Sequence, residues 1–292
     1  MSTNGSIYFL NSGSQPEHER LNTQHYLFDD IMQNELLPPH ITSLLSASPN
    51  PPKILEIATG TAIWLSEVAK ALHPDTEFVG LDFDTTKFPP PTSLVPNITL
   101  RQANMYKPFP SDLLGKFDVV NVRCIIFALK GGEGTNLVKN LMTLLKPGGH
   151  IVWAETGPLL TALEPPSSAW LKFQDVNYRF AKKVGRDLSL PIGMIRYIKE
   201  AGCEECDDKA YSASARLYKN NEDKADWTTR MNFQIRSLVT QTLTGIVHLG
   251  GVEGMSTKEE AGELIAQCNK EFVDSKVHML FTRAWGKKPA AS

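Results

Sequence analysis

Residues 54–64 read Ile-Leu-Glu-Ile-Ala-Thr-Gly-Thr-Ala-Ile-Trp, a hydrophobic strand that runs into small residues and then into the start of a helix. Small residues at such a turn let the backbone approach a ligand closely. Free amide groups at the start of the helix favour an electron-rich group. The turn therefore predicts a ligand site, although a dinucleotide site would need the same geometry.

The next predicted strand ends in a carboxylate. In Phe78-Val79-Gly80-Leu81-Asp82, the acid Asp82 follows the turn by about 20 residues. This spacing lets one carboxylate accept hydrogen bonds from both hydroxyls of a ribose. Asp82 could instead only cap a loop, but the preceding turn favours the ribose interpretation.

Strand-like and helix-like segments alternate around this turn, as in a parallel α/β sheet. The predicted strands are 53–58, 77–82, 97–102, 117–122 and 150–155, and two later strands, 209–218 and 277–285, would complete the sheet. The helices predicted between them are 63–72 and 135–145, with a Pro-broken stretch at 88–91. We expect an α/β fold with a Rossmann-like, doubly wound, seven-stranded sheet.

Helical patterns flank this core on both sides and predict cap elements. They cover 17–32, 168–184, 191–201 and 227–248, and Ser256-Thr257-Lys258-Glu259 has the form of a capping box. The predicted organisation is an N-terminal arm with cap helices at 1–50, a ligand-binding core at 51–157, a helical substrate cap with the sixth strand at 158–276, and the last strand and tail at 277–292. Residues 1–16 should form a loose arm.

Composition excludes several classes of protein. The 292 residues are 41% hydrophobic, enough for one large core, and 30 Lys and Arg face 32 Asp and Glu without a dense basic run. We therefore expect no nucleic acid partner. No secretory signal or apolar run long enough to span a membrane is evident, so a cytoplasmic protein is expected. Cys203 and Cys206 have metal-ligand spacing, but without a second Cys or His pair we expect reduced thiols and no metal.

Two further motifs decide between the nucleotide cofactors. Phe117-Asp118-Val119-Val120 and Leu144-Leu145-Lys146-Pro147-Gly148-Gly149, together with the turn, resemble the ordered motifs of class I S-adenosylmethionine-dependent methyltransferases. The chain is similar in particular to fungal secondary-metabolism methyltransferases in Glu19-Arg20-Leu21, Gln24-His25, Thr59-Gly60-Thr61, Ile63-Trp64, Asn121-Val122-Arg123 and the final Trp285-Gly286-Lys287-Lys288-Pro289. The resemblance implies S-adenosyl-L-methionine as cofactor and a small-molecule acceptor, methylated on oxygen or nitrogen.

The resemblance also implies where the cofactor binds. The cofactor-binding residues it suggests are Gln24, Glu56, Ala58, Thr59, Gly60, Thr61, Trp64, Asp82, Phe83, Asn104, Met105, Asn121 and Arg123. Asp82 and Phe83 would lie at the ribose and adenine, and Asn121 to Arg123 beneath the sulfonium.

Methyl transfer depends mainly on alignment of donor and acceptor, aided by a base that removes the acceptor's proton. His25 is the candidate base because imidazole titrates near neutral pH, with packing as the alternative. Arg123 is a second candidate catalytic residue, since its planar fork suits a carboxylate. Candidate acceptor contacts are Glu155, which ends a strand, and Trp170, Phe173 and Tyr178, which could equally belong to the core.

One departure keeps other functions open. Where the family usually has glycines on either side of the central one, this chain has Ala58 and Ala62, and each adds a methyl group near the expected cofactor. A non-methylating protein on the same fold, either a rearrangement or cyclisation catalyst or a regulatory binding module, is therefore the alternative. A nicotinamide oxidoreductase would need the spaced-glycine turn that is missing here. The oligomeric state stays open, a homodimer included.

Overall fold

The computed structural model describes residues 15–214, 224–273 and 275–290. The predicted loose arm, 1–16, lies almost wholly outside these residues. The same is true of the end of the predicted strand 209–218.

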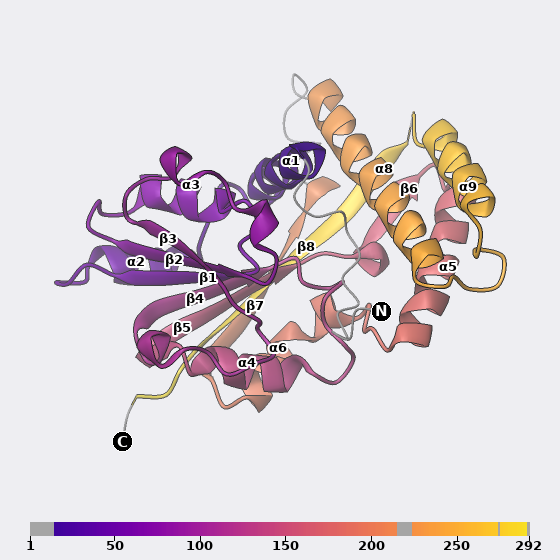
Figure 1. Cartoon of the computed structure of the whole chain (residues 1–292). Coiled ribbons are helices and arrows are strands. Elements are labelled where there is room, and N and C mark those ends of the chain that lie inside the picture. The colour runs from indigo at the N-terminus through magenta and orange to yellow at the C-terminus, as the bar shows by residue number, and fades with distance from the viewer. Residues whose placement is uncertain (1–14, 215–223, 274, 291–292) are drawn as a thin grey trace.

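A single twisted sheet forms the centre of the molecule (Figure 1). Its strands are β1 (Lys53–Ile57), β2 (Glu77–Asp82), β3 (Ile98–Gln102), β4 (Phe117–Arg123), β5 (Leu145–Glu155), β6 (Thr161–Glu164), β7 (Glu204–Ser212) and β8 (Lys276–Lys287). Their order is β3-β2-β1-β4-β5-β8-β6, with β7 also paired to β8. Strands β1 to β5 are parallel, and β8 runs antiparallel to its three neighbours. The carboxyl ends of the parallel strands therefore share one edge, where ligands bind in open α/β sheets.

Helices cover both faces of the sheet and extend beyond it. They are α1 (Gln15–Ile31), α2 (Pro39–Ser46), α3 (Ile63–Ala71), α4 (Gly134–Met142), α5 (Ser168–Val184), α6 (Leu190–Glu200), α8 (Lys224–His248) and α9 (Lys258–Glu271). Helices α2 and α3 pack their apolar residues on one face, and α4 and α6 on the other. A third apolar cluster joins α1, α5, α8 and α9. The doubly wound core with helical caps is confirmed.

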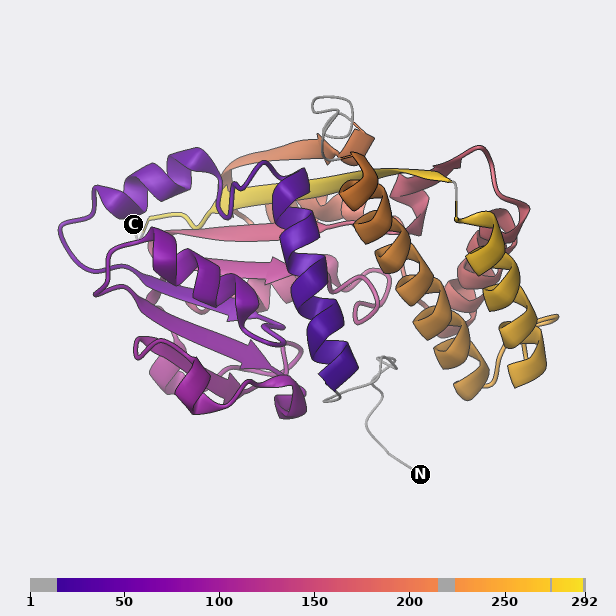
Figure 2. The same cartoon turned by 90° about the horizontal axis from the view of Figure 1, so that it is seen from above.

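Helix α1 lies next to α8, far from it in sequence, and both views show the two helices side by side (Figure 2). The pair is tied by Arg230 Nη1, which donates a hydrogen bond of 2.8 Å to Asp30 Oδ2, and by Gln241 Nε2, which donates one of 3.0 Å to Glu17 Oε2. The N-terminal and C-terminal caps therefore meet above the sheet.

The structure corrects three details of the expected fold. Within the described residues the sheet has eight strands, because the short β6, which was not predicted, pairs with residues 276–279 of β8. The sixth expected strand begins at Glu204, five residues earlier than predicted, since its polar residues follow an exposed edge. The capping box is formed by Thr257 and Glu260, one residue later than predicted.

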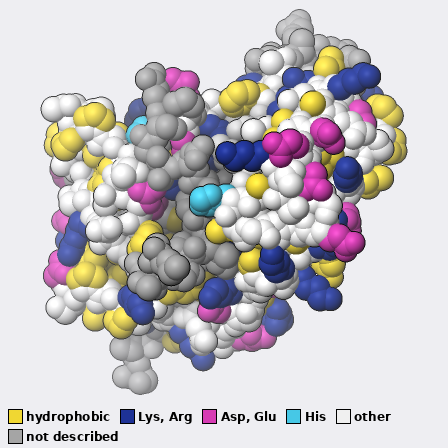
Figure 3. Space-filling model, turned by 45° about the vertical axis from the view of Figure 1, so that its right-hand side comes forward, with side chains coloured by type: hydrophobic (Ala, Val, Ile, Leu, Met, Phe, Trp, Pro, Cys, Tyr) yellow, Lys and Arg dark blue, Asp and Glu magenta, His cyan; other side chains and the backbone are white. Residues whose placement is uncertain are grey.

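Charged side chains of both signs are interspersed on the face that Figure 3 presents. Within the described residues, no helix combines the length and apolar character that crossing a bilayer requires.

Candidate active site

A cavity of about 990 Å³ opens at the carboxyl ends of β1, β2, β4 and β5. Residues of α1 and α8 also line it, so both caps cover the edge of the sheet. Its volume is at the upper end of the range typical of small-molecule sites, about 300 to 1,000 Å³. One continuous space thus extends from the turn after β1 to the end of β5.

Two carboxylates hold the turn after β1. Thr59 Oγ1 donates a hydrogen bond of 2.7 Å to Glu56 Oε2, and Gly60 N donates one of 2.8 Å to Asp82 Oδ2. Asp82 Oδ1 accepts a hydrogen bond of 2.9 Å from Asp84 N. Because each carboxylate oxygen offers two acceptor sites, Asp82 keeps acceptor capacity on the cavity wall. It can therefore accept hydrogen bonds from hydroxyl groups of a ligand.

Ala58, Gly60 and Ala62 all adopt positive φ angles, of 55°, 54° and 57°. A residue with a side chain pays roughly 1 to 2 kcal/mol for that conformation, which explains why glycines suit the turn. Ala58 is exposed on the cavity wall, whereas Ala62 is fully buried beneath α3. The expectation that both methyl groups approach the cofactor is therefore wrong for Ala62.

Arg123, the last residue of β4, connects three elements. Its Nη2 and Nε donate hydrogen bonds of 3.2 and 3.3 Å to Glu56 Oε1, and its guanidinium lies 5.7 Å from the centre of the Trp64 ring. Burial raises the pKa of Glu56 to about 7, although the charge of Arg123 offsets part of this effect. Both oxygens of Glu56 are engaged by protein groups, so this carboxylate positions the turn and Arg123.

His25 contacts Arg123 from α1. Its Nδ1 lies 3.3 Å from Arg123 Nη1, and because a guanidinium only donates, Nδ1 is the acceptor and Nε2 carries the proton. Burial, followed by the charge of Arg123, lowers the pKa of His25 to about 3. Nε2 is buried on the cavity without a hydrogen-bond partner among the described residues. This geometry favours hydrogen-bond donation by His25 and does not support its expected role as a base.

Glu155 ends β5 and is fully buried. Its Oε1 accepts hydrogen bonds of 2.6 Å from Ile125 N and 3.1 Å from Trp153 Nε1. Its Oε2 has no hydrogen-bond partner within the described part of the chain. Burial raises the pKa of Glu155 to about 8. The residue thus lines the cavity as predicted, with one oxygen held and the other available to a ligand.

Glu155→Gln is expected to change how stability depends on pH. The raised pKa means that the contribution of Glu155 to stability is fully present below its ordinary pKa of 4.5 and is lost as the pH rises through about 8. Glutamine keeps the oxygen that Ile125 and Trp153 contact but does not titrate. The melting temperature of the variant relative to wild type should therefore rise between about pH 5 and pH 9. Thermal unfolding tests this, and a difference that is constant with pH would contradict it.

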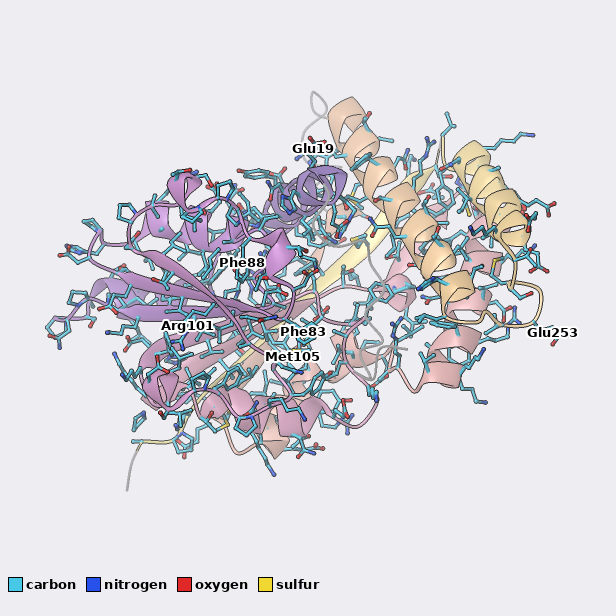
Figure 4. All side chains as sticks on the ribbon, viewed as in Figure 1. Glu19, Phe83, Phe88, Arg101, Met105 and Glu253 are labelled. Carbon is cyan, nitrogen blue, oxygen red and sulfur yellow. The ribbon has the colours of Figure 1, made fainter. Side chains whose placement is uncertain are left out.

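Five further predicted residues line the cavity, and these are Gln24, Thr61, Phe83, Asn104 and Met105. Phe83 and Met105, labelled in Figure 4, follow β2 and β3, and both line the cavity where these strands end. Such apolar side chains suit a flat aromatic ring. Thr61 Oγ1 donates a hydrogen bond of 2.6 Å to Asn22 Oδ1 of α1 and so ties this helix to the turn, whereas Gln24 accepts one of 3.2 Å from Arg20 within α1.

Five predicted site residues lie outside the described lining of the cavity. Trp64 is buried beneath Arg123 and donates to the carbonyl of Leu36, and Asn121 is buried within β4. Trp170 and Phe173 pack in the core between α5, α8 and α9, while Tyr178 is 58% exposed. The predicted acceptor contacts on α5 are therefore wrong, because its apolar face points into the helical cluster.

Phe173→Leu should accordingly affect stability and leave ligand binding unchanged. Phe173 is fully buried, so the smaller side chain leaves a partial cavity that costs about 1 to 2 kcal/mol of unfolding free energy. Denaturant unfolding measures the loss, and calorimetry with S-adenosylhomocysteine tests the affinity. The exposed Tyr178→Ala is the control on the same helix, with an expected change within about 0.5 kcal/mol. A large loss of affinity in Phe173→Leu would show that α5 contributes to the binding site after all.

Residues of α8 line the cavity although the sequence analysis did not assign them. They are Gln234, Ile235, Leu238 and Gln241. Gln234 is buried, and its Nε2 lacks a hydrogen-bond partner among the described residues. The sequence signal that could have found this face is the pair Gln234 and Gln241, which lie about two helical turns apart among apolar residues. Sequence alone does not show that this face meets α1.

The curated relatives of this chain are fungal methyltransferases, and the chain matches no family model. The N-methyltransferase tcpN of Claviceps purpurea is 27% identical over 80% of this chain and 82% of its own length. The methyltransferase grgD of a Penicillium species is 27% identical over 95% of this chain and 96% of its own. The N-methyltransferase gliN of Aspergillus fumigatus is 26% identical over 97% and 96%.

A solved structure shows the same fold. It is phosphoethanolamine N-methyltransferase 2 of Haemonchus contortus in complex with S-adenosyl-L-methionine, with a TM-score of 0.50 and 13% identity. The match covers 92% of this chain and 57% of that longer one. Fold, cavity and relatives together define this protein as an S-adenosylmethionine-dependent methyltransferase. Within that class it is similar to the fungal secondary-metabolism enzymes, as the motifs predicted.

Proposed function

We propose that this enzyme methylates a nitrogen atom of a small, largely apolar molecule. The observation that carries the proposal is the extent of the cavity, which continues from the Asp82 side of the sheet to Glu155 and α8. A site of this volume has room for a cofactor and a second ligand.

The relatives support nitrogen over oxygen as the methylated atom. Two of the relatives that align over four fifths or more of their length, tcpN and gliN, are named N-methyltransferases. The partial relatives verN of Clonostachys rogersoniana and sirN of Leptosphaeria maculans carry the same name. An amine nitrogen also suits a cavity with a buried carboxyl group, Glu155, whose Oε2 lacks a hydrogen-bond partner among the described residues, since an opposite charge stabilises the ionised acid.

The residues on the turn side fit S-adenosylmethionine. Asp82 retains acceptor sites for ribose hydroxyls, Phe83 and Met105 offer apolar surface to adenine, and Arg123 and Arg20 place positive charge near the expected carboxylate of the methionine moiety. The cofactor supplies an electrophilic methyl group on a positively charged sulfur. Glu56 and Glu155 are buried carboxyl groups on the same cavity, and a cationic ligand would stabilise their ionised forms.

The other side of the cavity would hold the acceptor. Its apolar lining comes from Phe28 of α1, Ile126 and Phe127 after β4, and Ile235 and Leu238 of α8. These side chains exclude water and fix the acceptor's orientation, and proximity and orientation supply most of the acceleration in such a transfer. Residues from three distant segments thus form one compartment.

The proposal includes a cytoplasmic enzyme without a nucleic acid partner. The nearly balanced charge of 30 basic and 32 acidic residues supports the absence of a nucleic acid partner, because nucleic acid binding relies on concentrated positive charge.

The experiment is a methyl-transfer assay with isotope-labelled S-adenosylmethionine and paired acceptors that differ only in carrying an amine or a hydroxyl. We expect label on the amine members of the pairs. Label on hydroxyl members alone would overturn the choice of nitrogen. Binding of S-adenosylhomocysteine without transfer to any acceptor in a broad panel of amines and alcohols would count against the enzyme activity itself.

A further inference from the structure

Three buried polar atoms without a hydrogen-bond partner among the described residues line the cavity. They are His25 Nε2 on α1, Glu155 Oε2 on β5 and Gln234 Nε2 on α8. All three side chains are at least nine-tenths buried. Because buried polar groups in folded proteins are almost always paired, a ligand in the cavity can provide the missing partners of these three atoms.

The three atoms differ in what they require. His25 Nε2 is a donor, since Arg123 occupies Nδ1, and the amide Nε2 of Gln234 is also a donor. Glu155 Oε2 is the group that can accept a hydrogen bond or a proton. Its position is fixed because Ile125 N and Trp153 Nε1 hold the other oxygen. A matching ligand therefore carries a donor group and a separate acceptor oxygen.

Resting on the proposed function, we propose that Glu155 Oε2 binds the acceptor amine as an ammonium ion and takes its proton. His25 and Gln234 then donate hydrogen bonds to an oxygen of the same molecule. In the proton transfer, one N–H bond breaks and its electron pair stays on nitrogen as the lone pair, while an O–H bond forms on Glu155. The total charge is unchanged, and the nitrogen becomes nucleophilic. The substrate class is a primary or secondary amine that carries a carbonyl or ether oxygen on an apolar frame.

The surroundings make Glu155 suitable for this role. Arg123 and Cys124 face it from the end of β4, with Arg20 and His25 on α1. Burial raises the pKa of Cys124 to about 12 and lowers that of His25 to about 3, so neither changes charge near neutral pH.

Among the remaining neighbours of Glu155, one more group, Glu56, titrates near neutral pH. Gln234 of α8 and Thr282 of β8, which pairs with Glu155, are uncharged. Glu56 lines the same cavity, and burial raises its pKa to about 7. A pH profile alone would therefore not separate the two acids, and the assignment needs the Glu155 variant.

The first test follows the Glu155 carboxyl directly by carbon NMR in protein labelled at glutamate and saturated with S-adenosylhomocysteine. Glu155→Gln identifies the signal by its disappearance. We expect this carboxyl to titrate near pH 8 and its pKa to fall by one unit or more with saturating benzylamine, because a cation stabilises the carboxylate. Benzyl alcohol should leave it unchanged. An ordinary titration near pH 4.5, or no response to benzylamine, would overturn the proposal.

The second test is kinetic and uses an amine that the methyl-transfer assay identifies. Glu155→Gln should lower kcat at least about 100-fold, the usual contribution of a positioned base, and remove the rise in rate toward pH 8. Glu155→Asp should recover part of the rate. Glu253→Gln, at an exposed position far from the cavity, is the control (Figure 4). A Glu155→Gln enzyme with normal kcat and pH profile would refute the role of Glu155 while leaving the proposed methyl transfer intact.

Discussion

Arg123→Met is expected to lower the unfolding free energy by about 3 kcal/mol at pH 8.5, because it leaves Glu56 buried without its cation. Glu56 is 2% exposed, so water compensates poorly for the lost guanidinium. Arg123 lowers the pKa of Glu56 against the effect of burial, so the variant raises that pKa further above 7. Glu56 is then neutral in both proteins at about pH 5, and the loss should be smaller there. Denaturant unfolding at both pH values measures the effect.

Two matched variants separate the buried charge from other causes. Arg123→Met combined with Glu56→Gln should recover much of the lost stability, since no buried charge remains. Arg101→Met, on β3, breaks an exposed ion pair with Asp112 and should cost no more than about 1 kcal/mol. Equal losses for Arg123→Met and Arg101→Met would contradict the structural role of Arg123.

Asp82→Ala should weaken the binding of S-adenosylmethionine by about 2 to 3 kcal/mol, which corresponds to roughly 30- to 160-fold in Kd. The variant removes the acceptor for ribose hydroxyls and also the acceptor that Gly60 N uses, so the turn loses a support. Isothermal titration calorimetry measures the change. Asp75→Ala, an exposed position just before the same strand, is the control and should bind normally.

Asp82→Asn refines this prediction, because the amide keeps one acceptor oxygen without the charge. We expect an affinity between those of Asp82→Ala and wild type. Wild-type affinity in Asp82→Ala would contradict the assignment of the ribose side of the cavity.

The sequence predicted the parallel half of the sheet, and most of the residues predicted at the turn line the cavity. Each strand there is a hydrophobic run bounded by turn residues, and Asp82 and Glu155 follow from the rule that ligands bind where parallel strands end. Short-range patterns suffice for such features.

The acceptor side was harder to predict because it depends on how distant helices pack. The sequence pattern of an apolar helix face is the same whether that face contacts a ligand or the protein core. On α5, Phe173 packs in the core. Gln234 could not be assigned without knowing that α8 lies beside α1. The protonation of His25 likewise depends on Arg123, which is 98 residues away in the chain.

The central claim is that this cavity binds S-adenosylmethionine, and calorimetric titration of the purified protein tests it most directly. The titration uses S-adenosylmethionine, S-adenosylhomocysteine and, as a control with the same adenosine group, NAD. The account predicts micromolar binding of the first two and none of NAD. Failure to bind either sulfur compound, or binding of NAD in their place, would contradict it.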